Sequence, residues 1–232
     1  MDMYRRSGLV TGILFLAADA AGFLTFISAP TLGAADLLPA VAAGEATVLA
    51  AALLALVMGW ADAGIGLAMY PVLRRHNEGV AIGAAAFRVL DGGFVGVGAV
   101  LLLLLVSVSR QAAAAGPLAP AQLQVLGRLV LDGRTWASEV GLMAWAIGAA
   151  LYYALFWRAR LVPRWLWAWG LAGLVPLLAA ILLVLFRRLE VHFSVHTLLV
   201  MPIGLQEIVL GAWLIARGFN PKAGNVPHAR AA

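Results

Sequence analysis

Six apolar stretches, each about 20 residues or longer, constrain the fold of this chain more than any other feature. They cover residues 8–27, 47–70, 80–106, 136–157, 165–186 and 193–215. About 20 mostly apolar residues are needed for a helix to cross a bilayer. Of the 232 residues, 63% are hydrophobic and 12% charged, which is far from the composition of soluble domains. We therefore predict an all-α, polytopic membrane helix bundle with six transmembrane helices in one domain, residues 1–220, followed by a flexible cytoplasmic tail, residues 221–232.

Basic residues between the stretches predict the orientation of the chain. With the N-terminus inside, the inner segments hold ten Lys and Arg residues and the outer segments hold five, while Arg88 falls within the third stretch. Cytoplasmic loops are enriched in Lys and Arg. Both termini are therefore predicted to be cytoplasmic, and the protein is expected in the inner (plasma) membrane of a bacterium.

The long outer segment from Ser107 to Thr135 has a helical pattern of its own. Leu123, Leu126 and Val130 recur at helical spacing within "PAQLQVLGRLVLD". Such a pattern is typical of an amphipathic helix at a membrane surface. We predict a short interfacial helix in this outer loop.

Residue usage excludes several classes of protein. There is no cysteine, so disulfides and thiolate sites are absent. Lys222 in the polar tail is the only lysine, which excludes an intramembrane Schiff base. The basic residues form short clusters between apolar stretches and not one stripe, so nucleic acid is not an expected partner. The expected partners are the lipid bilayer and an unidentified small molecule or ion, and the oligomeric state stays open.

Ionisable residues inside the apolar stretches are the candidate functional residues, because such groups are costly in a membrane. Their depth follows from the helical rise of about 1.5 Å per residue, counted from each cytoplasmic end. The count gives about 20 Å for Asp19, about 18 Å for Asp62 and Asp91, about 15 Å for Glu207 and about 13 Å for Arg88. These five residues, from four helices, are predicted to share one layer near the midplane.

Glycines predict which way the acids face, since small residues mark helix contacts in membranes. Asp62, for example, shares its face with Gly59 and Gly66. The acids should therefore point into the bundle. Arg88 and Asp91 are three residues apart on one face and can pair.

Four carboxylates and one guanidinium cannot all be charged in an apolar interior, because desolvation and mutual repulsion disfavour the charged acids. One hypothesis is a proton or cation site made of the four acids, with Arg88 holding one of them ionised. The other is a structural polar core, in which Arg88 pairs with one carboxylate and the remaining, neutral acids hydrogen-bond across helices with Gln206.

A second candidate set lies toward the outer side. His192 and His196 are one helical turn apart in "EVHFSVHTLL", and counting places Glu139 at a similar depth to His196. Two histidines and a carboxylate suit zinc, although such histidines are more often solvated residues at a helix end. We predict no cofactor, with zinc at these residues as the alternative.

Three segments resemble a known bacterial family of small multi-pass membrane proteins, a domain-of-unknown-function (DUF) family. They are "GLAMYPVLRRHNEGVAIGAAAFRVLDG", "ARLVPRWLWAWGLAG" and "LVMPIGLQEIVLGAWLIARGFNP", the last with the Pro-Ile-x-Leu-Gln-Glu motif of a final helix. The resemblance covers nearly the whole chain. It implies an integral membrane protein of about six helices and no assigned activity, and the paired histidines are not part of its pattern.

Together these observations predict a small transporter, or a proton- or cation-coupled carrier, that uses the acidic layer. An accessory or sensory membrane subunit with a structural polar core is the first alternative. A membrane-embedded metal hydrolase is the second. An enzyme is the less favoured class, because the outer side offers only two histidines.

Overall fold

The structure is a computed structural model that describes residues 2–115, 121–186 and 195–221. The described residues form helices, turns and bends, without a strand. In chain order the helices are α1 (Met3–Leu24), η1 (Thr25–Ser28), α2 (Ala29–Leu32), α3 (Leu37–Ala43), α4 (Glu45–Leu73), α5 (Glu78–Ala115), α6 (Ala121–Ala159), α7 (Arg164–Leu185) and α8 (Val195–Arg217). The all-α prediction is confirmed.

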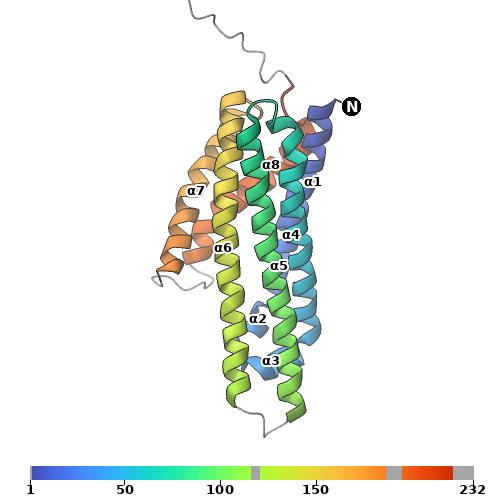
Figure 1. Ribbon diagram of the computed structural model, residues 1–232, viewed down its shortest axis with the longest axis vertical. Coiled ribbons are helices and arrows are strands. Elements are labelled where there is room, and N and C mark those ends of the chain that lie inside the picture. Colours follow the sequence, from blue (N-terminus) through green and yellow to red (C-terminus); the bar gives the residue numbers. More distant parts are fainter. Residues whose placement is uncertain (1, 116–120, 187–194, 222–232) are drawn as a thin grey trace, which may run out of the picture.

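Within the described residues, six helices are long and apolar enough to cross a membrane. They are α1 with its continuation through α2, then α4, α5, α6, α7 and α8. Each contains most of one predicted stretch, so the prediction of a six-helix, multi-pass membrane bundle is confirmed. Six crossings bring both chain ends to one side, and Figure 1 places the start of α1 and the end of α8 at the same end of the bundle. Which side of the membrane this is stays a prediction, and the predicted tail lies outside the described residues from Lys222 onward.

The six long helices form a closed ring that follows the chain order. Each packs against the next, and α8 returns to pack against α1. Close glycine contacts hold this last pair together: a Cβ added to Gly12 would lie 2.5 Å from the carbonyl oxygen of Gly211. At the end of the same pair, the Arg5 guanidinium donates to the carbonyl oxygens of Leu214 (3.2 Å) and Ile215 (2.6 Å). Both carbonyls belong to the last turn of α8, and that of Leu214 also accepts from the Gly218 amide over 2.9 Å.

Helices α5 and α6 are longer than a bilayer requires. They contain 38 and 39 residues, or about 57–59 Å at the helical rise, against about 30 Å for a hydrocarbon core. Figure 1 shows α4, α5 and α6 continuing past the ends of α7 and α8, with the short helices α2 and α3 beside the extension. A second hydrophobic core fills this extension around Leu37, Leu38 and Leu105.

The prediction of a short interfacial helix in the outer loop is wrong about where that helix lies. Residues 121–135 are helical, but they form the first turns of α6 and do not make a separate helix on the membrane surface. Val130 is buried in the second core and Leu123 packs against that core, whereas Leu126 is exposed. Most of the apolar stripe is therefore covered by protein, because α3 and α5 supply a packing surface that the sequence pattern does not reveal.

Candidate functional site

Arg88 of α5 is the centre of the polar site. Its side chain is completely buried (0% exposed). Glycine brings the neighbouring helix close to it, since a Cβ added to Gly66 of α4 would lie 3.0 Å from the Arg88 Cβ. A buried guanidinium must find hydrogen-bond acceptors and negative charge within the protein.

Two carboxylates from different helices supply that charge. Arg88 Nη1 donates to Oδ1 of Asp62, on α4, over 2.7 Å, and Arg88 Nη2 donates to Oε1 of Glu207, on α8. Asp62 and Glu207 are themselves buried. One guanidinium thus joins α4, α5 and α8 through charge-assisted hydrogen bonds, which are the stronger kind.

Aromatic rings surround the same guanidinium. Its central carbon lies 5.2 Å from the ring centroid of Phe15, 5.0 Å from that of Trp145 and 5.6 Å from that of Tyr152. These distances are within cation–π range. Arg88 Nη2 also donates to the Tyr152 hydroxyl over 3.4 Å. With Phe15 from α1 and two rings from α6, five helices converge on one side chain.

These rings were not predicted, although the sequence carries a signal for two of them. Trp145 and Tyr152 are seven residues apart and so lie on one face of a helix. Counted from Arg158, they lie about 20 Å and about 9 Å deep, which brackets the depth of Arg88. Depth counting applied to aromatic residues as well as to acids would have found them.

Gln206 hydrogen-bonds to Tyr153 and to the Leu166 carbonyl oxygen, and not to any of the four acids of the described chain, which corrects the structural-core hypothesis on this point. Its Oε1 accepts from the Tyr153 hydroxyl, and its Nε2 donates to the Leu166 carbonyl oxygen over 3.0 Å. Gln206 is fully buried and connects α8 to α6 and α7. The Tyr153 side chain also hydrogen-bonds to that of Tyr152, whose hydroxyl accepts from Arg88, so Gln206 is linked to Arg88 through these two tyrosines.

Two of the predicted acids remain without an ion pair. Asp91 is buried, and within the described chain it makes no hydrogen bond and does not pair with Arg88. Its Oδ1 lies against α6, 3.2 Å from where a Cβ of Gly141 would stand. Asp19 is half-buried, and its Oδ2 is enclosed without a hydrogen-bond partner. Both interact electrostatically with Arg88, Asp62 or Glu207, so the structure brings all four acids around one arginine.

Of the outer candidate residues His192, His196 and Glu139, the structure describes the last two. His196 Nε2 lies 3.4 Å from Glu139 Oε1, which brings these two residues together, and Glu139 is buried. His192 lies outside the described residues. Among residues 2–115, 121–186 and 195–221, no group of three or more His, Cys, Asp or Glu side chains could hold a metal ion. Zinc binding here stays a prediction.

Comparison with known proteins gives a family for this chain but no activity. The family model described as a domain of unknown function (DUF4386) matches residues 10–218. No curated protein and no solved structure matches the chain. The matched range includes Arg88, its two carboxylates and the three rings. The expected resemblance to a family of unknown function is confirmed, and the chain belongs to the DUF4386 family of proteins whose function is unknown.

Proposed function

We propose that this protein is a carrier of the bacterial inner membrane that binds protons or a small cation at its buried acidic layer. The two kinds of acid have different roles in this proposal. Asp62 and Glu207 fix the Arg88 guanidinium, whereas Asp19 and Asp91 bind the transported proton or cation. The supporting observation is that Asp19 and Asp91, near this arginine, have no ion-pair partner in the described chain.

The charge balance supports binding of positive charge. If all four acids were ionised, the single guanidinium would leave three negative charges uncompensated in an apolar interior. The cost of burying one unpaired ion is several kcal/mol, which is comparable with the total stability of a typical protein. Protons or a cation must therefore neutralise part of the layer. Two buried atoms, Arg88 Nε and Asp19 Oδ2, also have unused hydrogen-bonding capacity that a bound water or hydrated cation would use.

The alternative of an accessory subunit with a structural polar core also has a specific observation in its favour. Arg88 is fully buried, doubly paired and enclosed by three rings. Such an arrangement holds five helices in one geometry without any ligand. Under this alternative Asp19 and Asp91 are permanently neutral, and converting them to amides changes no activity.

Reconstitution into liposomes separates the two functions. The purified protein would be placed in vesicles that contain a pH-sensitive dye, and proton flux would be followed after imposing a pH gradient with or without opposing Na⁺ or K⁺ gradients. The test variants are Asp19→Asn, Asp91→Asn and the double variant. Asp132→Asn is the matched control, because Asp132 is an exposed aspartate on the extended part of α6.

The carrier proposal expects the unaltered protein and Asp132→Asn to accelerate flux, and the double variant to fall to the rate of empty vesicles. Circular dichroism would verify that every variant keeps its helix content. Flux that persists in the double variant would remove Asp19 and Asp91 from the site. Flux no faster than empty vesicles for the unaltered protein, with each cation, would favour the accessory subunit.

A further inference from the structure

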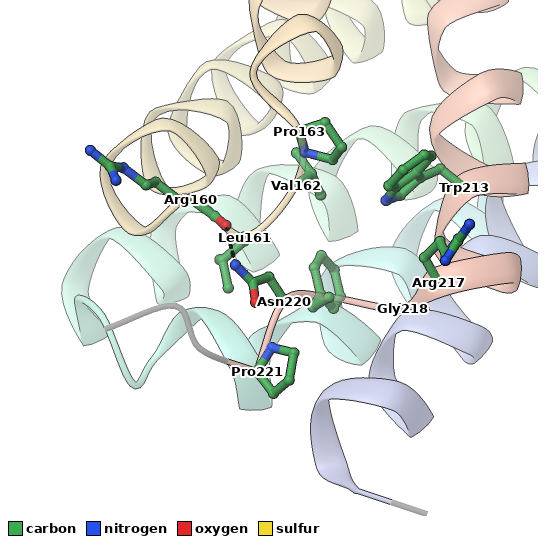
Figure 2. A pocket seen from close by; sticks show the side chains of 10 residues that line it. Arg160, Leu161, Val162, Pro163, Trp213, Arg217, Gly218, Asn220 and Pro221 are labelled. Atoms are coloured by element: carbon green, nitrogen blue, oxygen red, sulfur yellow. Dashed lines mark hydrogen bonds between the residues drawn. The ribbon is translucent and has the colours of Figure 1, made fainter. Parts of the chain in front are cut away.

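A pocket of about 400 Å³ opens at the end of the bundle where both chain ends lie. It lies between the α6–α7 connection and the segment that follows α8. Figure 2 shows Arg160 and Arg217 on opposite sides of this pocket, with Asn220 between them. The carbonyl oxygen of Arg160 faces Asn220, whereas the Arg160 guanidinium is directed away from the pocket. The volume is within the range of small-molecule sites.

Hydrogen bonds hold the two walls of the pocket together. Asn220 Nδ2 donates to the carbonyl oxygen of Arg160 over 3.2 Å, and the Asn220 amide donates to that of Leu161 over 2.9 Å. Leu161 and Phe219 are buried and give the pocket an apolar floor. The pocket is therefore formed before any ligand binds.

Arg160 occupies a backbone position that would suit glycine better. It has φ +52°, the only positive φ of a non-glycine residue in the described ranges. It ends α6, where the Leu161 amide donates to the Phe156 carbonyl oxygen over 3.2 Å in the pattern of a left-handed helix cap. The equivalent position after α8 is a glycine, Gly218, with φ +71°.

This contrast indicates that the Arg160 side chain has a use. A side chain in the left-handed region is less favourable than glycine there. Within the described chain the Arg160 guanidinium makes no ion pair, so no internal salt bridge accounts for arginine at this position. A long cationic side chain at the rim of a preformed pocket is instead suited to an external anion.

The whole end of the bundle is positively charged. Its exposed or half-buried arginines outnumber its acids, which among the described residues are Asp2 and Glu78. The arginines are Arg5, Arg6, Arg74, Arg75, Arg158, Arg160, Arg164 and Arg217. Tryptophans pack in pairs here, Trp157 with Trp167 and Trp165 with Trp213. Such aromatic belts lie at the level of lipid headgroups.

We propose that this pocket binds the phosphodiester headgroup of an anionic phospholipid. The exposed Arg160 side chain would turn toward the rim, where it and Arg217 would pair with the phosphate. The apolar floor and Trp213 would contact the glycerol and the first acyl carbons. Basic pockets between transmembrane helices bind anionic headgroups in this way. The proposal is independent of the carrier function, because the pocket lies at the bundle end and shares no residue with the acidic layer.

Native mass spectrometry tests the proposal. The full chain, in mild detergent, would be mixed with equal amounts of phosphatidylglycerol and phosphatidylcholine, and the lipids retained per protein would be counted. The pocket variant is Arg160→Asn with Arg217→Gln, since asparagine tolerates the left-handed backbone. The control is Arg74→Gln with Arg75→Gln, which removes the same charge at the same end of the bundle but outside the pocket. Arg160→Gly, which relieves the backbone, checks that any loss is not caused by misfolding.

We expect the unaltered protein and the control to retain phosphatidylglycerol in preference to phosphatidylcholine. The pocket variant should lose that preference by about tenfold or more, at about 1 kcal/mol per arginine. Arg160→Gly should lose part of it while melting at the same temperature or higher. An equal loss in the control would show diffuse surface charge and overturn the proposal, as would the absence of any preference in the unaltered protein. Displacement of the lipid by inorganic phosphate would assign the pocket to a free anion and also overturn it.

Discussion

Replacing Arg88 by methionine tests the central contacts of the bundle. Methionine keeps most of the length of the side chain but removes the guanidinium, so Asp62 and Glu207 lose the partner that each now has. Removing one member of a buried ion pair typically costs 3–5 kcal/mol, because the remaining charge is left buried and uncompensated. Here two carboxylates lose their partner at once. We therefore expect Arg88→Met to lower the free energy of unfolding by about 3–5 kcal/mol.

A companion variant separates charge from packing. In the triple variant Arg88→Met, Asp62→Val and Glu207→Leu, the whole charged set becomes apolar. Apolar replacement of a complete buried ion network is often neutral or stabilising, so the triple variant should recover to within about 1–2 kcal/mol of the unaltered protein.

The measurement is reversible unfolding by SDS in mixed micelles at neutral pH, followed by far-ultraviolet circular dichroism. Full stability of Arg88→Met alone would refute the assignment of the two ion pairs. A triple variant as unstable as Arg88→Met would show that the cost comes from lost packing against the three rings and not from unpaired charge.

Two further predictions concern the bundle as a whole. Gly92→Ala should destabilise by about 1–3 kcal/mol in the same unfolding assay, because its new Cβ would stand 2.2 Å from the carbonyl oxygen of Gly59, whereas Gly93→Ala, with nothing within 4 Å, should cost nothing. An unchanged Gly92→Ala would mean that α4 and α5 are further apart than described. For the orientation, the absence of native cysteine allows single-cysteine labelling in intact cells: a cysteine at Asn77 should react with an impermeant maleimide only after permeabilisation, and one at Gln111 should react without it. The reverse pattern would place the termini outside.

The parts of the site that could be predicted are those that depend on position along one helix. Depth follows from counting residues at a fixed rise, and counting placed Asp19, Asp62, Asp91 and Glu207 in one layer with Arg88, with which all four interact electrostatically in the structure. The family resemblance was also carried by local motifs. The direction in which Asp62 points was partly predictable as well, since Gly59 and Gly66, on the same face of α4, do lie against α5.

Pairing within that layer could not be predicted. Sequence spacing favoured Asp91 as a partner of Arg88, but the guanidinium turns to Asp62 and Glu207, 26 and 119 residues away. Likewise Gln206 is adjacent to Glu207 in sequence yet bonds to Tyr153 and to the Leu166 carbonyl. Which groups meet depends on the order and rotation of helices around the ring, and these are set by contacts between distant segments.

The sequence by itself determined that this is a membrane bundle of six crossing helices with charge at its centre, because the length and apolarity of a segment decide whether it spans a bilayer. Tertiary structure alone decided that α8 closes the ring against α1, and that closure brings Glu207 to Arg88. It also decided that α3 packs beneath the extended α5 and α6, and that Arg160 takes a backbone conformation suited to glycine. In each case the physical reason is the same: the energy lies in contacts between residues far apart in the chain, which no local pattern records.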